Sequence, residues 1–146
     1  MHILFVDDEL DYLKVYIEDI KLAASDNEQK EPSIKQFDSL DKAYRYVKEF
    51  GSNIDLIILD IMMPGGKNFH NKEKDPMGLK SGFYFYRAVR SNYPKIKINI
   101  FTNVTSEDIE ENIRADDWAE IYYKDQLLPF ELSDKIIEMS NKYQLI

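Results

Sequence analysis

A chain of 146 residues that is 44% hydrophobic can bury one core, and its lack of cysteine excludes disulfides, thiolate metal sites and cysteine nucleophiles. Its formal net charge of −8 repels phosphate backbones, so we do not expect direct nucleic-acid binding. No apolar run approaches the ~20 residues of a membrane span, and the start MHILFVDDE turns acidic too early for a signal peptide. We therefore expect a single cytoplasmic domain, residues 1–146, that does not bind a membrane.

The first half of the chain alternates short apolar runs with amphipathic stretches. The run 2–6 reads as a buried strand that stops at an acidic turn, and apolar residues recur at helical spacing over 10–24. The segment 33–37 predicts a weak strand, and 40–50 predicts a second helix. The run 54–59 is typical of a strand covered on both faces, so we expect it at the centre of a parallel sheet.

The second half continues this alternation. Phe83, Tyr86 and Val89 share the spacing of a buried helix face. The remaining predicted elements are a strand over 96–101, a helix over 105–115 opened by the capping-box pattern TSED, a strand over 121–124 and a last helix over 129–143. Five strands alternating with five helices predict an α/β fold, a doubly wound parallel sheet with helices on both faces.

Five polar residues follow or end the predicted strands. They are Asp7, Asp8, Asp60, Thr102 and Lys124. Each has an ordinary explanation alone, as a helix cap, a turn residue, a strand residue or a solvated lysine. The carboxyl ends of parallel strands meet at one edge, however, and three acids gathered there would repel one another unless a cation held them.

Magnesium is the cation that this set of side chains favours, because hard oxygen ligands with no His or Cys nearby suit Mg²⁺. A magnesium ion opposite a lysine and a hydroxyl can stabilise a transferring phosphoryl group. Carboxylates can form aspartyl phosphates, so Asp60 is the candidate nucleophile.

Four motifs carry a resemblance to a known family. FVDDE follows the first predicted strand, LIILDIMMPG spans the third, FT ends the fourth and a lysine ends the fifth. In this order the chain resembles the receiver domain of two-component response regulators, a flavodoxin-like (βα)5 fold. The resemblance implies strand order 2-1-3-4-5. It also implies that Asp60 is the phosphoacceptor, fed by a phosphohistidine on a sensor histidine kinase or a histidine phosphotransfer protein.

The same resemblance implies the other roles at the site. Asp8 and Asp60 would bind Mg²⁺ directly, Asp7 would act largely through water, and the backbone carbonyl of Met62 would complete the protein ligands. Thr102 would hydrogen-bond the phosphoryl group. Lys124 would pair with it.

Two features depart from the family pattern near the site. An insertion at about 65–80 precedes Gly82, the glycine that opens the third helix. It would screen the pocket, dock a partner or form a mobile solvated loop. Asp125 stands where the family has a proline after a cis peptide bond, so either strain is stored there or the loop takes another path. Whether the Lys124 side chain reaches Asp60 depends on which of these two alternatives is correct.

The predicted switch region also departs from the family. Ile121 replaces a Tyr or Phe, and isoleucine cannot signal by an aromatic ring flip. Asn103 replaces a small residue and could narrow access to Asp60. Met62 and Val104 offer no group that would orient attacking water, so we expect slow loss of phosphate.

Three functions compete. The first is a phosphorylatable receiver that is no enzyme beyond its own phosphorylation, stands alone and acts on a downstream protein target, with a homodimer as a possible assembly. The second is a receiver-like interaction scaffold that is never phosphorylated. The third, a Mg²⁺-dependent phosphatase, is disfavoured because such enzymes carry Asp-x-Asp where this chain has Asp7 and Asp8 in sequence.

Overall fold

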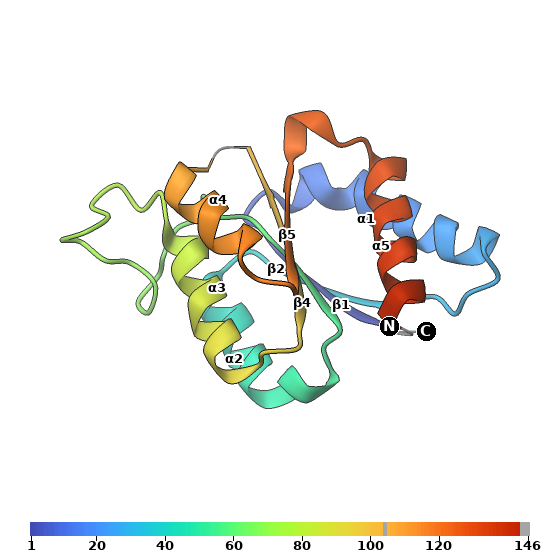
Figure 1. Ribbon diagram of the computed structural model, residues 1–146, viewed down its shortest axis with the longest axis horizontal. Coiled ribbons are helices and arrows are strands. Elements are labelled where there is room, and N and C mark those ends of the chain that lie inside the picture. The colour runs from blue at the N-terminus through green and yellow to red at the C-terminus, as the bar shows by residue number, and fades with distance from the viewer. Residues whose placement is uncertain (104, 144–146) are drawn as a thin grey trace.

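The structure is a computed structural model, and it describes residues 1–103 and 105–143. Five parallel strands form one sheet in the order β2-β1-β3-β4-β5, which confirms the predicted doubly wound, flavodoxin-like α/β fold and its strand order (Figure 1). The strands are β1 (His2–Val6), β2 (Ser33–Phe37), β3 (Leu56–Leu59), β4 (Lys97–Thr102) and β5 (Ala119–Tyr123). The helices are α1 (Leu10–Asp26), α2 (Leu40–Phe50), α3 (Ser81–Asn92), α4 (Glu107–Arg114) and α5 (Pro129–Tyr143).

Two layers of helices cover the sheet, with α1 and α5 on one face and α2, α3 and α4 on the other (Figure 1). Alternate residues of β3 enter the two cores. Leu56 and Ile58 pack toward α1 and α5, whereas Ile57 and Leu59 pack toward the other helices. All four are buried, as the continuous apolar run predicts. No helix in the described ranges is long and apolar enough to cross a membrane.

Several element ends differ by a residue or two from the prediction. β3 begins at Leu56, β4 extends to include Thr102, and β5 ends at Tyr123. Helix α4 begins later than the TSED pattern suggests, because Ser106 rather than Thr105 is its N-cap, and the serine hydroxyl accepts a hydrogen bond from the amide three residues on at 3.4 Å. Both residues carry the oxygen that a cap needs, so the pattern alone could not choose between them.

Residues 60–80 join β3 to α3 without a helix or strand, and part of this β3–α3 connection is buried. The ring of Phe69 packs with its centroid 5.3 Å from that of Tyr44 in α2 and 5.5 Å from that of Phe85 in α3. The buried carboxylate of Asp75 accepts a hydrogen bond from the backbone N–H of Lys80 at 2.7 Å. The connection is therefore packed onto the helical layer, and it is not a loop solvated along its whole length.

Asp41 of α2 holds the middle of this connection. Its carboxylate accepts hydrogen bonds from the backbone N–H groups of Lys67 at 2.9 Å and Asn68 at 3.2 Å. Gly66 just before them has φ +61°, and a Cβ there would lie 2.1 Å from Asp41 Oδ2. The left-handed backbone favours glycine at this position, and a side chain there would displace the Asp41 carboxylate from these hydrogen bonds.

The Asp41 contacts give a stability prediction. We expect Asp41→Asn to lower the free energy needed to open this connection locally by about 1 kcal/mol. The amide keeps one acceptor oxygen but loses the charge that strengthens these hydrogen bonds. The measurement is faster amide exchange at Lys67 and Asn68, with Asp38→Asn in the turn before α2 as the control. Unchanged exchange in Asp41→Asn would contradict the assignment.

The same hydrogen bonds predict a dependence on pH. The backbone N–H of Lys67, helped by Asn68, lowers the pKa of Asp41 below the usual value of an aspartate. Because the pKa is depressed in the folded state, the stabilisation is present above the ordinary carboxyl pKa of about 4 and is lost as the pH falls from there through the folded-state pKa. Protection of these amides should decline over that acidic range.

Candidate functional site

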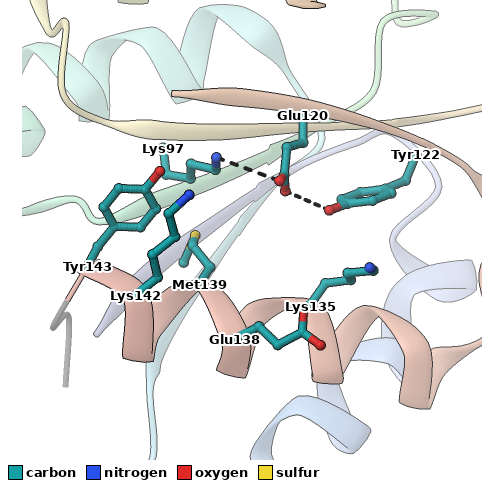
Figure 2. A pocket seen from close by; sticks show the side chains of 8 residues that line it. All are labelled: Lys97, Glu120, Tyr122, Lys135, Glu138, Met139, Lys142 and Tyr143. Atoms are coloured by element: carbon teal, nitrogen blue, oxygen red, sulfur yellow. Dashed lines mark hydrogen bonds and ion pairs between the residues drawn. The ribbon is translucent and has the colours of Figure 1, made fainter. Parts of the chain in front are cut away.

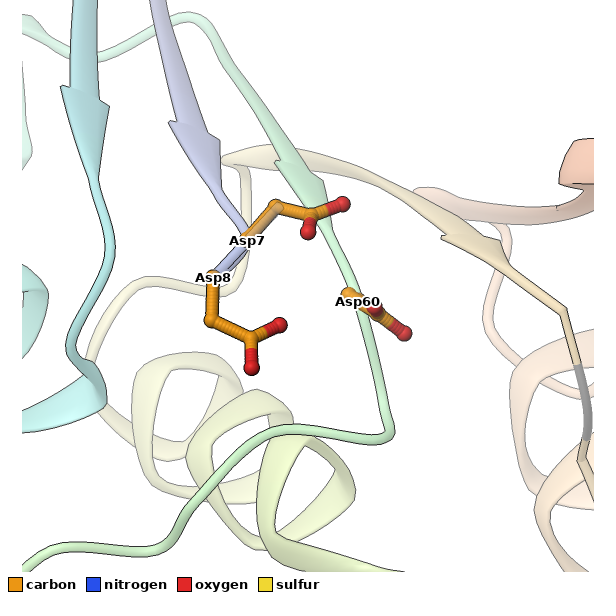
Figure 3. A group of neighbouring side chains, drawn as sticks. All are labelled: Asp7, Asp8 and Asp60. Carbon is orange, nitrogen blue, oxygen red and sulfur yellow. The ribbon is translucent and has the colours of Figure 1, made fainter. Parts of the chain in front are cut away.

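The predicted site residues come together at the carboxyl edge of the sheet. Val6 of β1 lies in register with Leu59 of β3, so the residues that follow them, Asp7 and Asp60, emerge side by side. Figure 3 shows Asp7 and Asp8 following β1 beside Asp60, which follows β3. One oxygen from each lies within 4.8 Å of the others.

This trio of carboxylates has the chemistry of a magnesium site. Asp7 and Asp60 are buried, whereas Asp8 is exposed, so an ion between them would keep an open side toward water. Burial raises the pKa of Asp7 above its usual value and outweighs the hydrogen bond from Lys124. Although Asp8 is exposed, partial desolvation of its carboxyl group raises its pKa above the usual value, and the charge of Asp60 adds to the rise. A divalent cation would relieve both costs, because it favours the ionised carboxylates.

Lys124 supplies a cation to the same cluster. It lies in a 3₁₀ turn, η2 (Lys124–Gln126), and is 3% exposed. Its Nζ lies 2.8 Å from Asp7 Oδ2, 3.1 Å from Asp60 Oδ2 and 3.3 Å from Glu9 Oε2. Burial alone would lower the pKa of Lys124, but the hydrogen bond to Asp7 and the charge of Asp60 raise it above its usual value. The lysine therefore stays charged.

The path of the chain after β5 resolves the question that Asp125 raised. No cis peptide bond occurs in residues 1–103 or 105–143. The η2 turn instead carries Lys124 inward, and the hydroxyl of Tyr12 in α1 donates to the Lys124 carbonyl at 3.3 Å. The Tyr12 ring centroid also lies 5.3 Å from Nζ, at cation–π distance. The loop thus takes another path, and Lys124 still reaches Asp60.

Asp60 is also held from its other side. The hydroxyl of Thr102 donates to Asp60 Oδ1 at 2.8 Å, and the backbone N–H of Met62 donates to the same oxygen at 3.1 Å. Thr102 is fully buried, whereas the side chain of Met62 is exposed. Both oxygens of Asp60 therefore have donors, Oδ2 from Lys124 and Oδ1 from Thr102 and Met62. That the Met62 carbonyl binds a metal remains a prediction.

The two predicted switch residues lie just after β4 and within β5. Asn103 is exposed directly after Thr102, and Ile121 is half-buried against the core under α2, α3 and α4. Val104, which we expected to leave attacking water unoriented, lies outside the described residues.

Sequence reasoning missed three residues at the site. Glu9 and Tyr12 contact Lys124 from the start of α1. Tyr123 is the register partner of Thr102, and its hydroxyl hydrogen-bonds the carboxylate of Glu110 in α4. The FVDDE motif contains Glu9 and so could have flagged it, but the two tyrosines have no pattern of their own.

Gly82 fixes how closely α3 approaches the site. Its backbone N–H donates to the Ile61 carbonyl at 2.9 Å. A Cβ at Gly82 would lie 2.2 Å from the backbone oxygen of Asp60 and 2.5 Å from Ile61 Cα. Only glycine fits, because the neighbouring atoms belong to the backbone that carries Asp60.

No family model and no curated protein sequence matches this chain. Solved structures do match it. A CheY-like response regulator receiver domain protein from Methanospirillum hungatei JF-1 superposes with a TM-score of 0.70 at 17% identity, covering 98% of this chain and 95% of that chain. A response regulator receiver domain protein from Clostridium thermocellum gives a TM-score of 0.68 at 22% identity, over 99% and 97%.

A third match was solved in the presence of a phosphate mimic. The isolated receiver domain of RcsB from Salmonella enterica serovar Typhimurium, with the phosphomimetic BeF3−, gives a TM-score of 0.65 at 15% identity, covering 97% of this chain and 88% of that chain. Identities this low concern the fold. Over nearly its whole length, the chain has the fold of the response regulator receiver domain.

Proposed function

We propose that this protein is a phosphorylatable switch that accepts a phosphoryl group on Asp60 from a phosphohistidine. The donor would be a sensor histidine kinase or a histidine phosphotransfer protein. The observation that carries the proposal is the convergence on one carboxylate of a buried lysine at 3.1 Å and a threonine hydroxyl at 2.8 Å, next to two further acids. These are the parts that phosphoryl transfer to an aspartate needs.

The transfer is a displacement at phosphorus. An oxygen of Asp60 forms a bond to phosphorus as the bond to the imidazole nitrogen breaks, and the imidazole keeps the electron pair and takes a proton from solvent. Asp7, Asp8, Asp60 and the Met62 carbonyl would hold Mg²⁺, which when bound neutralises charge on the phosphoryl oxygens. The ammonium of Lys124 and the hydroxyl of Thr102 would donate to the same oxygens.

The response would pass along β4 and β5 to α4. Thr102 would follow the phosphoryl group, and its register partner Tyr123 already contacts Glu110 of α4. A shift of Thr102 would therefore strain or release that contact and change the surface offered to a downstream protein target. Asn103 and Ile121 flank this route. Such a route would not need an aromatic ring at position 121.

A scaffold that is never phosphorylated is the second candidate. The observation that favours it is the completeness of the cluster, because Lys124 pairs with Asp7 and Asp60 and makes the acids compatible with burial without phosphate. The exposed Asp8 speaks against it, since a scaffold has no use for a third acid facing the same space.

One experiment separates the two candidates. The protein is incubated with acetyl phosphate and Mg²⁺, and intact mass is measured by mass spectrometry. We expect the mass of one phosphoryl group to be added to the parent protein and to Asp55→Asn, an acid at the other end of β3, but not to Asp60→Asn. If the parent protein gains no phosphoryl mass, and its own spectrum does not change when beryllium fluoride is added, the switch is refuted and the scaffold remains.

A further inference from the structure

A second polar pocket lies between β4, β5 and α5, away from the acidic site. Lys97 at the amino-terminal end of β4 forms one wall, whereas Thr102 of the acidic site is at the opposite end of that strand. Its volume is ≈ 220 Å³. Figure 2 shows its lining, which consists of Lys97, Glu120, Tyr122, Lys135, Glu138, Met139, Lys142 and Tyr143.

The ammonium of Lys97 is buried there with a poor partner. Lys97 is 4% exposed, and its ion pair with Glu120 has an Nζ to Oε1 distance of 3.9 Å, which is too long for a hydrogen bond. The Glu120 carboxylate instead accepts the Tyr122 hydroxyl at 2.6 Å. Buried charges are normally paired and hydrogen-bonded, so Lys97 has capacity left for an anion.

A second ammonium lies over the same ring. The Nζ atoms of Lys97 and Lys142 lie 5.5 Å and 5.2 Å from the centroid of Tyr143, and Figure 2 shows both lysines extending toward the same part of the pocket. Within the described ranges, Lys142 and Lys135 form no ion pair. Two ammonium groups so placed repel each other, and an anion between them would turn repulsion into attraction.

Behind this pocket lies Asn99, a buried amide that is an independent observation. It is 1% exposed, and neither its amide nitrogen nor its oxygen has a hydrogen-bond partner in the described part of the chain. It lies two residues from Lys97 on the same face of β4 and in register with Glu120 of β5. A buried amide without partners is rare in a native core, and this one lies next to two pocket residues.

We propose that this pocket binds a small polyol phosphate. Lys97 and Lys142 would hold the phosphate, because ammonium groups donate charge-assisted hydrogen bonds to its oxygens. Glu120 and Glu138 would accept hydrogen bonds from the hydroxyl groups. The two glutamates disfavour a ligand that is anionic throughout, since each would repel a second acidic group.

The test is an NMR titration of the labelled protein with glycerol phosphate. We expect saturable shifts at Lys97, Glu120 and Tyr143 and of the Asn99 side-chain amide. Lys142→Gln should weaken binding about tenfold through loss of one charged donor. Lys48→Gln is the matched control and should bind like the parent, because Lys48 is also exposed over a tyrosine ring, 5.0 Å from the centroid of Tyr44, on the opposite face of the sheet.

Two further ligands test recognition of the phosphate and of the hydroxyl groups separately. Inorganic phosphate should bind more weakly than glycerol phosphate, and glycerol should not bind. Glu120→Gln should bind inorganic phosphate at least as tightly as the parent, because a negative charge beside Lys97 is removed, and it should narrow the preference for the ester. The absence of saturable shifts with glycerol phosphate, equal losses in Lys142→Gln and Lys48→Gln, or equal binding of phosphate and ester would each overturn the assignment.

Discussion

Replacing Lys124 with methionine should lower the free energy of unfolding by about 3 to 5 kcal/mol in buffer without divalent ions. Methionine fills a similar space but leaves the carboxylates of Asp7 and Asp60 buried without the cation that lies 2.8 Å and 3.1 Å from them. Removing one partner of a buried ion pair costs far more than an exposed pair contributes. Urea unfolding followed by circular dichroism measures the difference.

Two controls test the cause of that loss. Adding Mg²⁺ should restore part of the stability of Lys124→Met, since the ion supplies another cation to the same acids. Combining Lys124→Met with Asp60→Asn should cost less than the sum of the two single changes, because the neutral amide no longer repels Asp7. A Lys124→Met protein as stable as the parent would show that repulsion between the Asp7 and Asp60 carboxylates does not destabilise the fold.

Replacing Gly82 with alanine is expected to cost about 1 to 3 kcal/mol of stability and to prevent phosphoryl transfer to Asp60. The added Cβ would lie 2.2 Å from the Asp60 carbonyl oxygen and 2.5 Å from Ile61 Cα. Backbone atoms cannot rotate away as a side chain can, so either α3 or the strand end carrying Asp60 must move. Intact mass after treatment with acetyl phosphate and urea unfolding measure the two effects.

Ser81→Ala is the control for this change. Ser81 is buried one position earlier in the first turn of α3, and alanine there is smaller than serine, so this variant should stay close to the parent in both assays. If Gly82→Ala unfolds within about 0.5 kcal/mol of the parent and still takes up phosphate, the close approach of α3 is not needed at the site.

The sheet was predictable from its apolar runs, and the acidic site was predictable from the positions where those runs end. Apolar runs mark the strands, and a parallel arrangement brings their carboxyl ends to one edge. The rule therefore located Asp7, Asp60, Thr102 and Lys124 before any contact was known, and the structure brings them within hydrogen-bonding range of one another. That these residues act in phosphoryl transfer stays a prediction until the adduct is measured.

Contacts that depend on how elements are rotated and packed were not predictable. Tyr12 and Lys124 are 112 positions apart, and which face of α1 meets η2 follows from helix packing that no local pattern encodes. The burial of Phe69 was missed because it lies in a segment without periodicity. Lys97 was missed because lysine is normally solvated, whereas here the strand carries it under the end of α5.

The position of Lys124 limits the free energy that phosphorylation of Asp60 would supply for a change of shape. Its ammonium already has three acidic partners at rest, Asp7, Glu9 and Asp60. A phosphoryl group on Asp60 would have to draw it away from the other two, and only the difference between the old and new attractions would drive the change of shape. The return to rest is favoured by the same competition. A chain with this arrangement would reset by itself once the phosphate is lost, without a further protein to pull the lysine back.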